Sequence, residues 1–379
     1  MSSPLRLEEL IESLPLEDTV ESKFLLASLR PSEIAHALER SRQPTRRVIW
    51  QLLEEEERNQ ALQHISDEVR AEFLEAMDTA QLVAAADDLD TDDFADILQQ
   101  LPQTISDQVL ASLDTSDRAR VEAVLSFRED SAGGLMDTDT ITVRPRHTLE
   151  LVLRYLRLRK ELPAGTDALI VVNSEDQYLG MLPLAKVLTS DPSVTVREIM
   201  DSDAPALHVD QPDTEIARMF SDRDLISAAV VDDQGQLRGR ITIDDVVDVI
   251  IEDAEEAVLG PAGLDVDEDT FAPVHRTVRR RATWLGINLL TAFAAAAVIN
   301  VFEETIVKVV ALAVLMPIVA SMGGIAGTQT LTLVIRGNAL GQLNRRNILW
   351  MLNREVLIAA LNGLLWSQSP QPCYSMTGF

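Results

Sequence analysis

The C-terminal part of the sequence constrains the fold most. Residues 282–302 contain no charged side chain and are mostly apolar. About 20 such residues in an α-helix cross the hydrocarbon core of a bilayer. A second apolar stretch, residues 305–335, contains the glycine-rich run 322–329, which predicts an irregular break at membrane depth. A third stretch begins near Leu349, so residues 282–366 are predicted to form an α-helical membrane region with two full spans and a partial third.

Charge separates this membrane region from the rest of the chain. Residues 272–379 hold 9 basic and 3 acidic side chains, whereas the preceding residues hold 24 and 58 and carry a net charge of −34. Arginines lie before the first span and after the second. The positive-inside rule therefore predicts a multi-pass protein of the inner (plasma) membrane with a cytoplasmic acidic body. Such a body argues against nucleic acid as a partner, because phosphates need clustered Lys and Arg, and it favours divalent cations.

Residues 21–130 follow a predicted N-terminal extension of residues 1–20 and show no strand pattern. Their apolar residues recur at spacings of three and four, as in Phe94-Ile97-Leu98. Capping residues precede the short helices, for example Asp90-Thr91-Asp92-Asp93, which predicts a helix capped at Thr91. Short helices cannot bury their faces alone, so they are predicted to stack as an acidic, α-helical superhelical domain.

Residues 136–198 and 199–257 repeat one pattern of strand, helix, strand, turn, strand and helix. The predicted hairpin turns, residues 173–177 and 232–235, occupy equivalent positions in the two repeats. This tandem resembles a pair of CBS motifs. The resemblance implies an α/β module in which both units fold together around a cleft, with residues 258–281 as the linker to the first span.

The order of these parts resembles one family. An acidic helical domain, the run Asp130 to Met136, two CBS units, a long acidic helix and the membrane sequence M-P-I-V-A-S-M-G-G-I-A-G-T-Q-T-L-T-L-V-I-R-G are similar to the MgtE family of magnesium channels and transporters. The likeness covers residues 21–366. It implies a multidomain homodimer with a central pore for Mg²⁺, whose cytoplasmic domains sense intracellular Mg²⁺ and gate the pore.

Acidic residues at helical spacing are candidate sensor ligands. Mg²⁺ binds carboxylate oxygen and retains water, so one or two carboxylates suffice for a site. Asp92 and Asp96 lie four residues apart and share a helix face. The match to the family implies the following metal ligands: Asp92, Asp96, Asp224, Asp245, Asp248, Asp253 and Glu256. The family often has a further acid where this chain has Ala257, and for any single acid the alternative is a solvated helix face.

Thr242 and Asp245 have a second interpretation. In the CBS signature a hydroxyl contacts phosphate and an acid three residues later holds ribose hydroxyls, and these two residues match that pattern. The first unit has Pro183 and Lys186 at the corresponding places. The resemblance therefore implies at most one nucleotide site, for ATP or a related adenine nucleotide.

The membrane region contains candidate pore-lining residues. Glycines permit close helix approach, whereas amide and hydroxyl side chains offer oxygens. The candidates are Asn288, Gly323, Gly324, Gly327, Thr328 and Gln329, with helix packing and a neutral interhelical hydrogen bond as alternatives. The pore acid of the family lies on a last membrane helix that this sequence lacks. Residues 367–379 are polar, so we expect a C-terminally truncated, transport-deficient member of the family with an aberrant tail.

No catalytic constellation is present in the sequence. The five histidines are scattered, at positions 36, 64, 147, 208 and 275, and no P-loop occurs. The chain is therefore predicted not to be an enzyme. Two alternatives remain open. One is a regulatory CBS module that binds adenine nucleotide or divalent cation without transport of its own. The other is a different membrane CBS family that exports divalent ions, and the helical domain argues against it.

Overall fold

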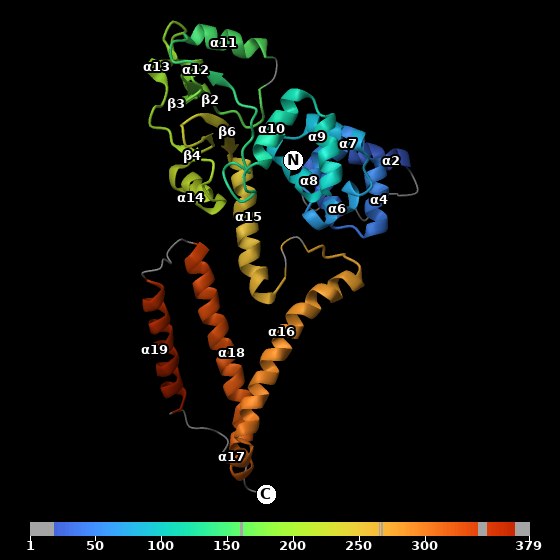
Figure 1. Cartoon of the computed structure of the whole chain (residues 1–379), viewed down its shortest axis with the longest axis vertical. Helices are drawn as coiled ribbons and strands as arrows, with labels where there is room; N and C mark the ends of the chain where they lie inside the picture. The colour runs from blue at the N-terminus through green and yellow to red at the C-terminus, as the bar shows by residue number, and fades with distance from the viewer. Residues whose placement is uncertain (1–18, 160–161, 265, 267, 340–346, 368–379) are drawn as a thin grey trace. The chain divides into compact units, whose positions relative to one another are not determined.

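The computed structural model describes residues 19–159, 162–264, 266, 268–339 and 347–367 (Figure 1). The chain divides into two compact units, residues 1–255 with 265–274, and residues 256–264 with 275–379. We describe each unit by itself. The predicted extension of residues 1–20 and the predicted aberrant tail of residues 367–379 lie almost entirely outside the described residues.

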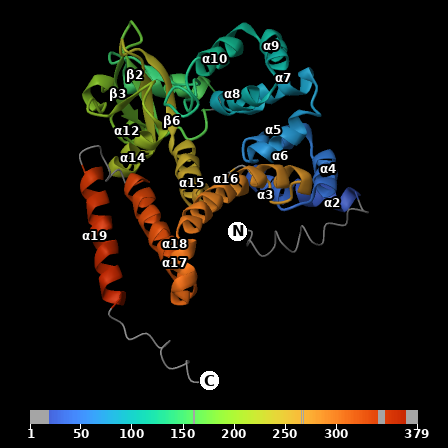
Figure 2. The same cartoon turned by 60° about the horizontal axis from the view of Figure 1, so that its bottom comes forward.

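The first unit begins with a domain of short helices. These are α2 (Thr19–Leu26), α3 (Pro31–Glu39), α4 (Gln43–Leu52), α5 (Glu55–Leu62), α6 (Asp67–Leu74), α7 (Thr79–Asp88), α8 (Thr91–Gln100), α9 (Gln103–Ser112) and α10 (Thr115–Leu125). Alternate helices contact each other, α3 with α5, α5 with α7, and α7 with α9. Figure 2 shows α2 to α6 gathered at one end of this domain and α7 to α10 at the other. This stacking confirms the predicted superhelical array.

Local capping explains where the short helices begin. Pro31 is the first residue of α3, and the backbone N–H of Arg30 donates to Glu33 Oε2 at 2.9 Å. Asp114 caps α10 by accepting from the N–H groups of Ser116 and Asp117 at 2.7 and 2.9 Å. At α8 the N-cap residue is Asp90 rather than Thr91, which is the first helical residue. The predicted cap was therefore one residue late.

Two small sheets of equal topology follow in the same unit. The first consists of β1 (Thr142–Val143), β2 (Ala168–Val172) and β3 (Tyr178–Pro183), with α11 (Leu149–Leu158), α12 (Leu184–Thr189) and α13 (Val196–Ile199). The second consists of β4 (Ala206–His208), β5 (Ser227–Val231) and β6 (Leu237–Thr242), with α14 (Asp213–Arg223). In each sheet the first pair is parallel and the second antiparallel. The predicted repeat is confirmed.

Equivalent turns close the two hairpins. Asn173 Oδ1 accepts from the N–H groups of Glu175 and Gln177, each at 2.9 Å. Asp232 Oδ1 accepts in the same way from Gln234 and Gln236, each at 2.9 Å. Side chains that bond the backbone two residues ahead fix such turns, so both predicted hairpins follow from their Asn or Asp.

The apolar core joins the helical domain to the second CBS-like unit. One cluster of buried side chains includes Phe94 and Val124 from the helical domain and Met136 from the segment that follows it. The same cluster includes Ile216 and Ile241 from the second CBS-like unit. The first CBS-like unit has its own core around Leu149, Leu169 and Leu182. The two sheets share a smaller cluster in which Ile170 and Met181 pack with Ala229. Helices and sheets therefore form one body.

Helix α15 (Ile243–Leu259) continues directly from β6, and the 3₁₀ turn η1 (Gly260–Ala262) follows it. The second unit contains α16 (Val274–Val301), α17 (Glu303–Lys308), α18 (Val310–Ala339) and α19 (Ile348–Ser367). Within the part of the chain that the structure describes, three helices are long and apolar enough to cross a membrane, over Val274–Val301, Leu315–Gly337 and Ile348–Leu365.

The predicted break in the second span is wrong. Helix α18 runs without interruption through the glycine-rich run 322–329. Backbone groups in a membrane need internal partners, and continuous α-helix satisfies them where a glycine-rich loop would not. The stretch predicted as a partial third span is the 20-residue helix α19.

Candidate metal centre

Asp92 lies at the start of α8 and is almost completely buried. Its side chain is part of the first turn, and the residue is 7% exposed. Within the described part of the chain, Asp92 Oδ1 is buried and has no hydrogen-bond partner. A buried carboxylate oxygen without a partner is unfavourable unless a proton or a cation compensates it.

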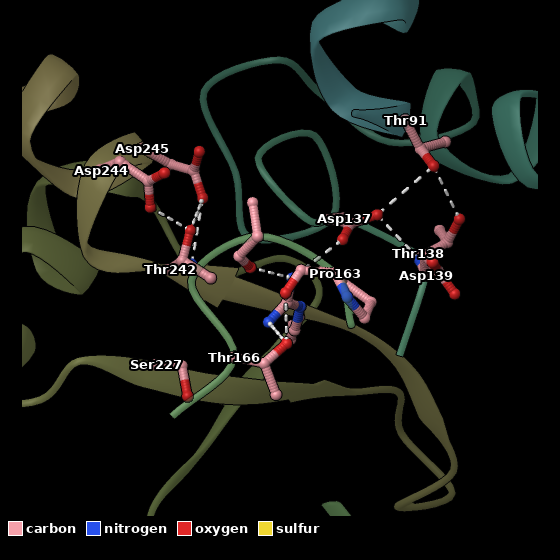
Figure 3. Close-up of polar contacts among 12 residues, drawn as sticks. Thr91, Asp137, Thr138, Asp139, Pro163, Thr166, Ser227, Thr242, Asp244 and Asp245 are labelled. Atoms are coloured by element: carbon pink, nitrogen blue, oxygen red, sulfur yellow. Dashed lines mark hydrogen bonds and ion pairs between the residues drawn. The ribbon is translucent and has the colours of Figure 1, made fainter. Parts of the chain in front are cut away.

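Asp245 lies in the first turn of α15 and is held by the end of strand β6. The backbone N–H and the hydroxyl of Thr242 both donate to Asp245 Oδ2 at 3.0 Å, and the hydroxyl also contacts Asp244 Oδ1 (Figure 3). Because Thr242 ends the strand and Asp245 lies in the first turn of the helix that follows directly, the strand–helix junction itself fixes the carboxylate.

The acids of α8 and α15 interact with one another. Burial raises the pKa of Asp92 well above its usual value, and the charge of Asp245 adds to the effect. Burial raises the pKa of Asp93 to about 8, and among the neighbouring charges Asp245 has the largest effect on this pKa. Burial also raises the pKa of Asp245 to about 7, against the hydrogen bonds from Thr242. The structure therefore brings together carboxylates whose ionisation opposes one another.

A buried ion pair lies beside these acids. Asp137 and Arg240 exchange backbone hydrogen bonds at 2.9 Å, and the Arg240 guanidinium lies 3.4 Å from Asp137 Oδ2. The same guanidinium donates to the carbonyl of Ala164 at 2.7 Å. Thr91 of α8 contacts Asp137 Oδ1 at 3.5 Å (Figure 3). Asp137 thus links the start of α8 to strand β6.

The remaining predicted acids are more dispersed. Asp96 is half-buried on α8, and burial together with the charge of Glu129 raises its pKa to about 7. Asp248 lies exposed near His64, and Asp253 and Glu256 are exposed along α15. Asp224 is exposed and ends α14 in a left-handed conformation, with φ 51°. The structure therefore brings together Asp92 and Asp245 but not the whole predicted set.

The cluster fits Mg²⁺ better than a metal that needs a full protein cage. Among the described residues, no three His, Cys, Asp or Glu side chains converge closely enough to hold an ion alone. Mg²⁺ keeps several waters and needs only one or two carboxylates. The unpartnered Asp92 oxygen supplies a hard donor of that kind.

The predicted nucleotide residues lie in the same place. The Thr242 hydroxyl donates to Asp245. A Cβ atom added at Gly165 of the first CBS-like unit would lie 3.5 Å from the Thr242 methyl group, so the two segments are close. The segment from Ala164 to Asp167 also accepts hydrogen bonds from Arg240 and Ser227 of the second CBS-like unit. The two units therefore meet at the predicted signature.

The predicted pore residues lie on α16 and α18. Asn288 is exposed on α16, and Gln329 is exposed on α18. Thr328 Oγ1 donates to the carbonyl of Gly324 at 3.1 Å. Added Cβ atoms at Gly323, Gly324 and Gly327 would meet no described atom within 4 Å. Within the described chain, these glycines border open space.

Family models match three parts of the chain. The MgtE intracellular N domain matches residues 29–130, the CBS domain matches residues 196–252, and the divalent cation transporter region of MgtE matches residues 316–373. The magnesium transporter MgtE of Thermus thermophilus is 31% identical over 362 residues, which cover 94% of this chain and 80% of the relative. The chain belongs to the MgtE family. The Bacillus subtilis MgtE is 29% identical and covers 75% of this chain and 63% of the relative.

Two solved structures resemble about two thirds of this MgtE family member. The crystal structure of the cytosolic domain of the Mg²⁺ channel MgtE in complex with ATP has a TM-score of 0.59 and 32% identity, and covers 64% of this chain and 99% of that chain. The soluble part of a magnesium transporter has a TM-score of 0.57 at 20% identity, with 65% and 98% covered, and supports the fold alone.

The sequence missed three residues of the cluster. Asp93 follows Asp92 directly, so a run of acids in the first turn was a usable signal. Asp137 and Arg240 gave none, because they are 103 residues apart and neither belongs to a spaced motif.

Proposed function

We propose that the chain is a subunit of a homodimeric Mg²⁺ transporter whose cytoplasmic body senses intracellular Mg²⁺ and gates the pore. The observation that carries the proposal is the buried Asp92 Oδ1, which has no hydrogen-bond partner among the described residues, beside the charge of Asp245. Membership of the MgtE family and three helices of membrane-spanning length and composition support transport. The arginines that flank the spans support a plasma-membrane protein whose acidic body lies on the cytoplasmic side.

Sensing follows from the electrostatics of the cluster. Without a cation, the ionised forms of Asp92, Asp93 and Asp245 repel one another, and this repulsion favours separation of α8 from α15. A hydrated Mg²⁺ placed against Asp92 and Asp245 offsets both charges. Mg²⁺ therefore stabilises the arrangement in which the helical domain packs against the second CBS unit, and α15 carries that state toward the membrane unit.

The other family-matched acids extend the same proposal. Asp96 lies near the charge of Glu252 on α15, so a second ion between α8 and α15 fits there. Asp224, Asp248, Asp253 and Glu256 are exposed and suit weaker ion binding or contact with a second copy of the chain. In the membrane unit, Asn288, Gly323, Gly324, Gly327, Thr328 and Gln329 remain our candidates for the pore wall.

Limited proteolysis of residues 1–274, here called the soluble body, tests whether this part of the chain senses Mg²⁺. The soluble parts of related proteins crystallise on their own, so residues 1–274 are a suitable fragment. Millimolar Mg²⁺ should slow cleavage between α10 and β1 relative to NaCl of equal ionic strength. Asp92→Asn and Asp245→Asn should each abolish that protection, whereas the exposed Asp87→Asn should retain it. Equal protection by Mg²⁺ and NaCl would refute sensing at this cluster.

A regulatory module that binds adenine nucleotide is the second candidate function. The observation in its favour is the pairing of Thr242 with Asp245 at the junction of the two CBS units, together with the ATP complex of the related cytosolic domain. The same proteolysis experiment with ATP in place of Mg²⁺ separates the two. Protection that Thr242→Val removes would support nucleotide binding, and protection confined to Mg²⁺ would favour the cation sensor alone.

A further inference from the structure

Glu355 is the acidic residue within the three candidate membrane spans. The sequence windows 274–301, 315–337 and 348–365 contain no other Asp or Glu. Glu355 lies seven positions after Ile348 at the start of α19, which is about 10 Å along the helix axis. An ionisable side chain at such a position is energetically unfavourable, and it typically marks an ion pathway or a proton site.

The structure turns this carboxylate toward the neighbouring span. The Glu355 side chain is 12% exposed although α19 is otherwise largely exposed. Its Oε2 lies 3.4 Å from Thr330 Oγ1 on α18. Its Oε1 is buried and has no hydrogen-bond partner among the described residues, since Arg354 Nη1 approaches only to 3.7 Å. Glu355 Oε2 therefore competes with the carbonyl of Ala326 for the single hydroxyl hydrogen of Thr330, and Oε1 is unsatisfied among the described residues.

The face of α18 that carries Thr330 leaves room for a hydrated ion. Gly323, Gly327 and Thr330 follow spacings of four and three and so share one helix face. Added Cβ atoms at the two glycines would meet no described atom within 4 Å. The Thr330 hydroxyl already donates to the carbonyl of Ala326 at 3.1 Å, so its lone pairs remain available as oxygen ligands.

We propose that Glu355 and Thr330 form a site for a hard divalent cation inside the membrane unit. The choice of Mg²⁺ as its ion rests on the proposed function. A carboxylate and a hydroxyl are hard oxygen ligands, and Mg²⁺ completes its octahedron with the water that the glycine face admits. Arg354 alone is a poor counter-ion, because its side chain is 52% exposed and makes no hydrogen bond to Glu355.

Carboxyl modification in the full chain tests this site. The 379-residue chain is reconstituted in phosphatidylcholine liposomes and treated with dicyclohexylcarbodiimide, which modifies carboxyl groups in apolar surroundings. Mass spectrometry then quantifies modified Glu355. Millimolar Mg²⁺ should reduce its modification about fivefold relative to NaCl of equal ionic strength, as mass action predicts for a site near saturation. Glu355→Gln removes the modified peptide and so assigns the signal.

Matched variants separate cation binding from helix packing. Thr330→Val should shift protection to higher Mg²⁺, whereas Thr332→Val, which removes a hydroxyl that donates to the carbonyl of Thr328, should not. Equal modification in Mg²⁺ and in NaCl would overturn the site. Absence of modification without Mg²⁺ at acidic pH would also overturn it, because the carboxyl would then be fully ion-paired. Failure of sensing in the soluble body leaves this measurement unaffected, so the two proposals fail separately.

Discussion

Burial changes the pKa and the hydrogen bonding of individual carboxylates in this protein, and the sequence alone does not reveal which ones. Asp92 and the exposed Asp87 are both acids of short helices, yet Asp92 is 7% exposed and its Oδ1 has no hydrogen-bond partner among the described residues. The pKa of Asp93 is raised to about 8, and those of Asp96 and Asp245 to about 7, in each case mainly by burial. Near neutral pH these residues therefore lie close to the boundary between the protonated and the ionised state.

The stability of the soluble body should consequently fall as pH rises from about 4 to about 8 in buffer without divalent cations. Folded Asp93, Asp96 and Asp245 bind protons more tightly than the unfolded chain does, so their contribution is complete below the unfolded pKa of 3.8 and is lost as pH rises through about 7 and 8. Urea denaturation of residues 1–274 at each pH measures the free energy of unfolding.

Asp93→Asn should flatten this pH dependence and raise stability at pH 8 by about 1–3 kcal/mol, because an amide needs no ionisation. Mg²⁺ should flatten it in the wild type as well, since ion binding compensates the ionised form. Asp87→Asn is the control that should leave the curve unchanged. A free energy of unfolding that increases from pH 4 to pH 8 in every variant would contradict the argument.

At the scale of elements, a buried ion pair attaches the segment before the first span to the helical domain. Arg46 of α4 is 2% exposed and donates to both carboxylate oxygens of Asp269 at 2.7 Å. The backbone N–H of Asp269 donates to Glu68 Oε2 at 3.0 Å. Because a bidentate guanidinium–carboxylate pair is specific in geometry, residues 268–274 follow the helical domain rather than the membrane unit.

Arg46→Met should destabilise residues 1–274 by about 3–5 kcal/mol, because it removes the buried guanidinium that donates to both carboxylate oxygens of Asp269. It should also expose the segment around Asp269 to proteases. Denaturation and proteolysis of residues 1–274 measure both effects. Arg47→Met is the control, since the Arg47 side chain is 64% exposed and its pair with Glu72 should contribute less than about 1 kcal/mol. Equal effects of the two variants would show that the buried pair has no special role.

At the scale of the whole molecule, the cytoplasmic acids and the membrane unit should act as a regulator and its target. Mg²⁺ influx into liposomes that contain residues 1–281 of this chain fused to the membrane region of the Thermus thermophilus relative, followed with an entrapped indicator, should decrease when Mg²⁺ is supplied on the side of the acidic body. Asp92→Asn with Asp245→Asn should weaken this decrease several-fold without reducing influx at low Mg²⁺. An unchanged decrease in the double variant would place the regulator elsewhere.

Local chemistry alone was sufficient for much of the architecture. The spacing of apolar residues predicts short stacked helices, Asn173 and Asp232 determine equivalent hairpins, and uncharged runs predict the spans, because each signal acts over a few neighbouring residues. Local composition failed at the glycines of residues 322–329. There it suggested a break, but the backbone demand for internal hydrogen bonds in a membrane favours the continuous helix α18.

The candidate sites show the limit of the sequence. Family resemblance and helical spacing identified Asp92 and Asp245 as ligands, since both lie in the first turns of helices. Only the tertiary structure decided that Asp92 is buried with one oxygen that no described residue bonds, that Asp137 pairs with Arg240, and that Glu355 faces Thr330. These properties depend on segments 25 to 103 residues apart, and the desolvation that raises a pKa exists only after such segments have packed together.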